Sequence, residues 1–183
     1  MKTWTTVSWI ALAVASQACF AQTPNAPMSG TPVAGQPAGD AAFVRKAFQI
    51  NTTELELSKM ARNDATNPVV IKFSTQMVRD LSQSNRDLQN IAEKRGIAIP
   101  TSLDAEHAAL VRKLTMERGS DLHMEYAEDM TMLDQQAIPL YQAEAADSNP
   151  DVAAFAQRQL PTLEASEKVA QQITASAGTH RIG

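Results

Sequence analysis

Apolar residues recur at alternating spacings of three and four positions along five segments of the chain, which is typical of helices that bury one face. The first segment carries this pattern at Phe43, Ala47, Ile50, Glu54, Leu57 and Ala61. The second carries it at Val70, Phe73, Met77, Leu81, Leu88 and Ile91, before Gly96 and Pro100. A short segment at 103–114 and two longer ones at 122–140 and 150–173 follow. The pattern predicts an all-α protein in which a carboxylate, Glu54, lies on an otherwise apolar face.

Two stretches of the chain, 67–74 and 149–156, begin alike. Each places Asn before Pro and then sets a Val and a Phe three positions apart, as expected for a capped helix start. The repeat predicts one helical hairpin used twice, with Phe73 and Phe155 at equivalent core positions. Two hairpins can bury their apolar faces as an antiparallel four-helix bundle. The short segment adds a helix before the third long helix, which we expect Ser120 to cap.

The N-terminal residues have the features of a secretory signal. Lys2 supplies a positive charge, and the apolar run 7–14 is too short to span a bilayer as a helix. Small residues at Cys19 and Ala21 place a cleavage site directly after Ala21. We therefore expect a signal peptide at 1–21 and a periplasmic protein whose mature chain has no transmembrane span.

Cys19 leaves an alternative open. It is the only cysteine of the chain, and it would carry a lipid if the protein were a lipoprotein. Ser16 argues against lipid attachment, because an aliphatic residue is expected at that position. Cleavage after Ala21 would leave the mature chain without a thiol, a disulfide or a cysteine metal ligand.

Composition divides the remaining residues into three parts. Residues 22–40 are rich in Pro and Gly and are expected to form a disordered spacer. Residues 41–175 form the predicted bundle domain, and 176–183 a flexible tail. The formal net charge of −4 becomes −5 when Lys2 is removed with the signal. This charge is too mild to indicate a nucleic-acid partner.

Several motifs resemble the bacterial envelope proteins grouped as domain of unknown function 4142 (DUF4142). The motifs are Glu54-Leu55-Glu56-Leu57 with Lys59-Met60-Ala61, Gln76-Met77-Val78-Arg79-Asp80 with Ser82 and Asn85, Leu103-Asp104-Ala105-Glu106-His107, and Leu160-Pro161-Thr162-Leu163. The similarity covers about 43–173. It implies a ferritin-like bundle in the cell envelope, often labelled as an outer-membrane protein, and it implies no established activity.

The metal ligands that the resemblance would imply are largely missing. Members of the family usually carry histidines at three positions held here by Leu81, Asp134 and Ser166, whereas Glu54 and His107 match the family's pattern. A di-iron bundle also needs Glu-x-x-His pairs on two helices, and the sequence contains none. Glu54 and Asp134 remain weak candidates for binding a hard cation with water. Such carboxylates more often lie on the wet rim of a bundle.

Other chemistry has less support in the sequence. There is no cysteine nucleophile, Gly-x-Ser-x-Gly turn or phosphate loop, so we predict no catalytic residue and no cofactor. The methionines at helical spacing, among them Met116 and Met130, are interpreted as core residues rather than copper ligands. We expect a non-enzymatic envelope protein that acts by binding an unidentified partner or in stress tolerance. One alternative is a carboxylate-based metal-binding bundle, in which Glu54 and Asp134 would face one another inside the core. A second is an oxidoreductase of the di-iron type, against which the missing Glu-x-x-His pairs argue.

Overall fold

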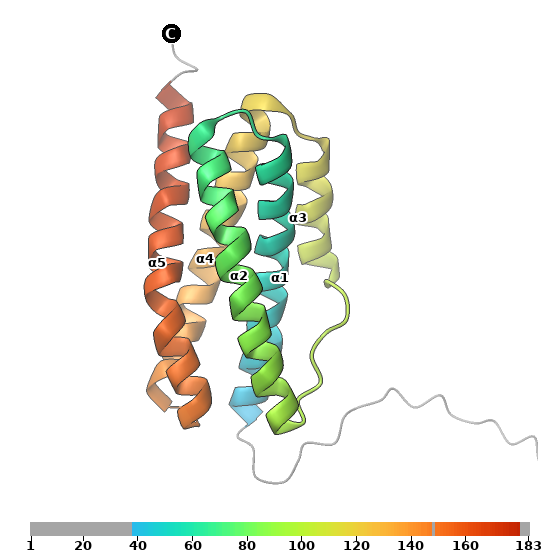
Figure 1. Cartoon of the computed structure of the whole chain (residues 1–183), viewed down its shortest axis with the longest axis vertical. Coiled ribbons are helices and arrows are strands. Elements are labelled where there is room, and N and C mark those ends of the chain that lie inside the picture. Colours follow the sequence, from blue (N-terminus) through green and yellow to red (C-terminus); the bar gives the residue numbers. More distant parts are fainter. Residues whose placement is uncertain (1–37, 148, 180–183) are drawn as a thin grey trace, which may run out of the picture.

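The protein is an all-α bundle of four long helices with one short helix outside it (Figure 1). The computed structural model describes residues 38–147 and 149–179. Its helices are α1 (Ala38–Asp64), α2 (Pro68–Arg95), α3 (Ala105–Met116), α4 (Gly119–Asp147) and α5 (Pro150–Thr179). The described residues contain no strand, and none of their helices is long and apolar enough to cross a membrane. The predicted four-helix bundle with a short helix before the third long helix is confirmed.

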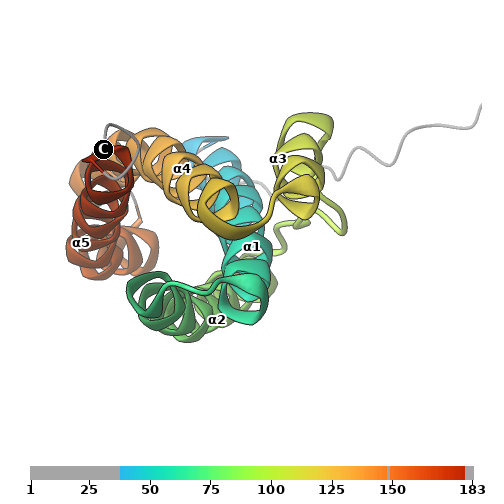
Figure 2. The same ribbon diagram turned by 90° about the horizontal axis from the view of Figure 1, so that it is seen from above.

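The bundle consists of two antiparallel hairpins, α1–α2 and α4–α5. Viewed from above, the order around the bundle is α1, α2, α5, α4, and α3 lies outside, beside α1 and α4 (Figure 2). Helix α3 and the loop before it carry the chain back along the bundle, so α4 runs in the same direction as α2 (Figure 1). One long crossover between two hairpins is the connectivity of ferritin-like folds.

Both hairpins use the predicted Asn-Pro start for their second helix. The Asn67 side chain accepts a hydrogen bond of 2.9 Å from the Val69 backbone N–H, and Asn149 accepts one of 3.4 Å from Asp151. Helix α2 ends at Arg95, and Gly96 directly after it has a left-handed φ of 62° and caps the helix. The sequence indicated this end. Local sequence signals therefore determine these three boundaries, namely the starts of α2 and α5 and the end of α2.

Three boundaries differ from the sequence predictions. Ser120 is not a cap, because α4 begins at Gly119 and the Arg118 carbonyl accepts the first bonds of the helix. Helix α1 begins at Ala38, inside the predicted spacer, since Asp40 is buried and pairs with Arg95 at 2.9 Å. Helix α5 also continues to Thr179, past the expected start of the tail. The predicted signal peptide and most of the spacer lie outside the described residues.

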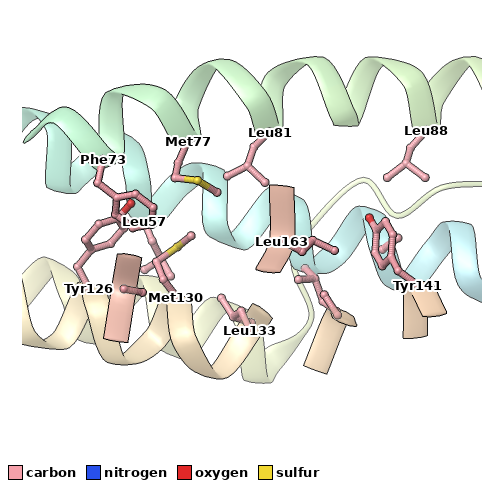
Figure 3. Packing of buried hydrophobic residues seen from close by; sticks show 14 of the residues in the cluster. Leu57, Phe73, Met77, Leu81, Leu88, Tyr126, Met130, Leu133, Tyr141 and Leu163 are labelled. Atoms are coloured by element: carbon pink, nitrogen blue, oxygen red, sulfur yellow. The ribbon is translucent and has the colours of Figure 1, made fainter. Parts of the chain in front are cut away.

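Aromatic and aliphatic side chains fill the centre of the bundle (Figure 3). Phe155 and Tyr141 pack with ring centroids 5.9 Å apart, and Phe73 lies 5.8 Å from Tyr126. Both phenylalanines are buried, as the repeat predicted. Met130 is also buried, whereas Met116 is 79% exposed, so the interpretation as core residues is wrong for Met116.

Candidate functional site

The first residue of the site is Glu54, in the middle of α1. Its side chain has no solvent exposure and lies on the helix face that also buries Ile50 and Leu57. Neither of its carboxyl oxygens has a hydrogen-bond partner among the described residues. The predicted carboxylate in an apolar face is therefore present, and it lies at full depth in the core.

The second residue is Asp134, in α4, which packs against α1. Asp134 is also fully buried, and both of its carboxyl oxygens lack a hydrogen-bond partner within the described part of the chain. The Ser166 hydroxyl of α5 lies close enough to lower the pKa of Asp134, although it does not reach hydrogen-bonding geometry. The expectation that these carboxylates lie on a wet rim is wrong, since both side chains are fully buried in the bundle.

Burial and mutual repulsion decide the protonation of this acid pair, Glu54 and Asp134. Burial raises the pKa of Glu54 well above its usual value, and the charge of Asp134 raises it further. Burial likewise raises the pKa of Asp134 to about 8, with Ser166 opposing and Glu167 adding to the shift. The two carboxyl groups therefore titrate as a pair, and near neutral pH the pair retains at least one proton unless a cation replaces it.

Two buried hydroxyl groups, those of Tyr126 and Ser58, lie near the acid pair. Tyr126 and Ser58 share a hydrogen bond of 3.0 Å, and the charges of Glu54 and Asp134 both raise the pKa of Tyr126, after burial. Ser58 lies one helical turn after Glu54, so it shares the buried face of α1.

A second buried network lies one turn before Glu54. Tyr141 donates to Asn51 at 3.4 Å, and Asn51 donates to Ser84 at 2.7 Å. The charge of Glu54 also raises the pKa of Tyr141, after burial. Asn51 and Ser58 were not predicted from the sequence, although their spacings of three and four residues from Glu54 place them on the same helix face.

The positions where the family usually has histidines are all buried in the bundle. Leu81 points into the interior of the bundle (Figure 3), and Asp134 and Ser166 are also buried. The part of the chain that the structure describes has no group of three or more His, Cys, Asp or Glu side chains suited to a metal ion. The residues present here therefore supply oxygen donors and lack the imidazoles of a transition-metal site.

The two histidines of the bundle have structural partners. Asp104 caps α3 by accepting from the His107 backbone N–H at 3.0 Å, and it also pairs with His107 Nδ1 at 2.8 Å. The backbone N–H of His107 is the main reason why the pKa of Asp104 is lowered. His123 accepts backbone N–H bonds from Thr66 at 3.1 Å and Asn67 at 3.4 Å. Burial lowers the pKa of His123, which favours the neutral ring that can accept these bonds.

Comparisons with known proteins agree with this architecture. A DUF305 fragment from Deinococcus radiodurans has a TM-score of 0.70 and 15% identity, covering 77% of this chain and 98% of that one. CopM in its Cu(II)-bound form has a TM-score of 0.64 and 14% identity, covering 75% of this chain and 96% of that one. At these identities the likeness concerns the fold, and no curated protein sequence matches. The sequence profile of the domain of unknown function DUF4142 matches residues 25–173, and the chain belongs to this family.

Proposed function

We propose that this protein is a non-enzymatic helical-bundle protein that binds a hard cation at the acid pair. The observation that supports this function is the burial of Glu54 and Asp134 with four carboxyl oxygens that have no hydrogen-bond partner among the described residues. Leaving a polar group buried without a partner costs about 1–3 kcal/mol. Two such groups on neighbouring helices are expected where a ligand or a proton satisfies them.

The donor set selects the class of ion. Carboxylate and hydroxyl oxygens suit Mg²⁺, Ca²⁺ and Mn²⁺, whereas copper and zinc favour imidazole and sulfur ligands. Ser166 adds a buried hydroxyl beside Asp134, and water would complete the coordination. CopM, which has a similar fold, was solved with Cu(II), so a bundle of this kind can hold a metal ion.

Protons compete with the cation for the same oxygens. The pKa of Asp134 is raised to about 8, and that of Glu54 is raised well above its usual value. Binding of a divalent cation requires the ionised carboxylates and therefore releases protons. Affinity should rise by about tenfold per pH unit for each proton displaced, as long as the pH is below the pKa values.

Titration calorimetry with Mn²⁺, Ca²⁺ and Mg²⁺ at pH 6 and pH 9 tests this function. We expect binding of one ion per chain that is at least about tenfold tighter at pH 9, and loss of binding in Glu54→Gln and Asp134→Asn. The matched control is Glu56→Gln, whose carboxylate is two residues away and pairs with Lys59 on the surface. Absence of stoichiometric binding at pH 9, or equal binding by Glu54→Gln and the natural protein, would contradict it.

The proposed place of action is the cell envelope. The pattern of Lys2, the apolar run 7–14 and the small residues before Gln22 supports export and cleavage. A binding role in the envelope, including one in stress tolerance, agrees with the family resemblance. Intact-mass spectrometry of protein purified from the envelope measures where the mature chain begins. We expect the mass of a chain whose first residue is Gln22. An acylated Cys19 as first residue would contradict the predicted cleavage.

A further inference from the structure

The seam between α2 and α5 is the least closely packed of the four seams in the bundle. Where α2 begins and α5 approaches its end, near the top of Figure 1, this seam contains a groove of about 530 Å³. A volume of this size is in the range of small-molecule sites. The groove does not contain the acid pair, so what it binds is independent of the proposed cation site.

The floor of the groove is apolar. Val69 and Phe73 of α2 line it together with Val169 of α5. Val69 is 59% exposed, and it is one of three large apolar side chains in the described residues that are exposed. An alkyl chain placed along these side chains would remove this apolar surface from water.

Two cations flank the floor. Lys72 and Arg79 line the groove, are exposed, and have no ion-pair partner among residues 38–147 and 149–179. They are seven residues apart on one helix, about 10 Å along its axis, so they stand at different points of the groove. No Asp or Glu is among the described residues that line it.

Two acidic side chains that are close in sequence to residues of the groove have other partners. Asp80 accepts from Gln76 at 2.9 and 3.0 Å, and Glu167 accepts from Gln135 of α4 at 3.0 Å. Because Lys72 and Arg79 take part in none of the ion pairs among the described residues, their positive charge can meet an anion from outside the chain. Arg79 offers a planar fork of donors that suits a carboxylate or phosphate.

We propose that this groove binds the monomer of a single-chain amphiphile with an anionic headgroup, a long-chain carboxylate. The alkyl chain lies on Val69, Phe73 and Val169, and the carboxylate pairs with Arg79 or Lys72. The volume of the groove fits a small molecule rather than the length of a partner helix. The two unpaired cations favour an anion over a neutral lipid.

Titration calorimetry of the full chain with decanoate, below its micelle concentration, tests the proposal. We expect one decanoate per chain, with decanol at least about tenfold weaker because it cannot form the charge-assisted bond. Arg79→Gln or Lys72→Gln should weaken decanoate about tenfold, and Val69→Ser should weaken decanoate and decanol alike. Arg62→Gln, which removes an exposed cation of α1 that does not line the groove, is the control and should leave affinity unchanged.

Three results would overturn the binding of an anionic amphiphile monomer in this groove. They are equal affinity for decanoate and decanol, unchanged decanoate affinity in both cation variants, and binding to vesicles of neutral and anionic phospholipid without binding of the monomer. The last result would identify Lys72 and Arg79 as contacts for a membrane surface. Decyl phosphate, titrated in parallel, distinguishes the headgroups, and a preference of tenfold or more for it over decanoate would overturn the assignment to a carboxylate.

Discussion

A carboxyl group inside an apolar core is stable in its neutral form, because the protein does not replace the water that would stabilise its charge. Glu54 and Asp134 both meet this condition, and the charge of either one would oppose ionisation of the other. Without a cation, the folded protein should therefore retain protons on this pair at pH values where the unfolded chain has released them. The free energy of unfolding therefore depends on the protonation of these two residues.

This linkage predicts how stability depends on pH. The pKa of Asp134 is raised from 3.8 to about 8, so the folded state holds a proton between these values that the unfolded state has lost. The stability that this proton provides is fully present below the unfolded pKa and is lost as the pH rises through the folded pKa. The expected loss is about 1.4 kcal/mol per pH unit for each such proton. Urea unfolding in the absence of divalent ions, between pH 5 and pH 9, measures it.

Asp134→Asn should make this dependence less steep, since the amide cannot ionise. Asp129 also contributes to the pH dependence of stability. Burial and repulsion by Glu125 raise its pKa to about 7, so its contribution likewise falls as the pH rises. Asp129→Asn is therefore the matched variant, and only the Asp134 change should also abolish cation binding. A pH dependence in Asp134→Asn as steep as in the natural protein would contradict the assignment.

Sequence spacing could identify Glu54 as unusual but could not place it at depth. The three and four residue spacing assigns a side chain to a helix face, whereas depth depends on which helices cover that face. The cap that His123 provides for the α1–α2 turn was missed for a related reason. Its contacts with Thr66 and Asn67 join residues more than 50 positions apart in sequence, and only the packed hairpins bring them together.

At the scale of helices, the two hairpins share their start and differ in their surroundings. Phe73 and Phe155 hold the same position after an Asn-Pro start, but Phe155 is fully buried against Phe43 and Tyr141. Phe73 is 8% exposed because it lies in the loosely packed seam between α2 and α5. The repeat in the sequence predicted where α2 and α5 begin, since Asn and Pro act locally, and it could not predict how tightly each helix packs.

Replacing each phenylalanine by alanine should destabilise the protein to a different degree, because the two side chains differ in burial. Phe155→Ala should lower the free energy of unfolding by about 3–5 kcal/mol, the usual effect of deleting a buried aromatic side chain. Phe73→Ala should be at the lower end of this range, because its site opens to the groove and can relax. Thermal and urea unfolding provide the measurement, with the exposed Val69→Ala as control. Unchanged stability of both phenylalanine variants would refute the model of two equivalent hairpins.

At the scale of the whole molecule, the crossover through α3 determines which side chains meet. Because α3 returns the chain along the bundle, α4 packs beside α1 and α5 beside α2 (Figure 2). This order brings Glu54 of α1, Asp134 of α4 and Ser166 of α5 into one core. Leu81 comes from the fourth long helix, α2. The bundle could be predicted from four amphipathic helices, whereas the neighbours across the crossover required the structure.

This arrangement predicts the result of restoring the histidines that the family usually carries. Leu81→His, Asp134→His and Ser166→His together should create a zinc site with Glu54, because imidazole and carboxylate are ligands that zinc favours. Without metal, three buried imidazoles lack hydrogen-bond partners, so the variant should melt at a lower temperature than the natural protein. Zinc binds the folded state and should restore the melting temperature, since ligands from all four helices would then be held together.

Calorimetric titration with zinc and thermal melts with and without zinc measure both effects. The control adds Glu54→Gln to the three histidines, which should weaken zinc while leaving the metal-free melt close to that of the triple variant. The natural protein should bind zinc weakly, because the acid pair offers two carboxyl groups and belongs to no group of three or more His, Cys, Asp or Glu side chains suited to a metal ion among the described residues. Tight binding of one zinc by the natural protein, or no gain in the triple variant, would contradict the view that Leu81, Asp134 and Ser166 occupy a lost transition-metal site.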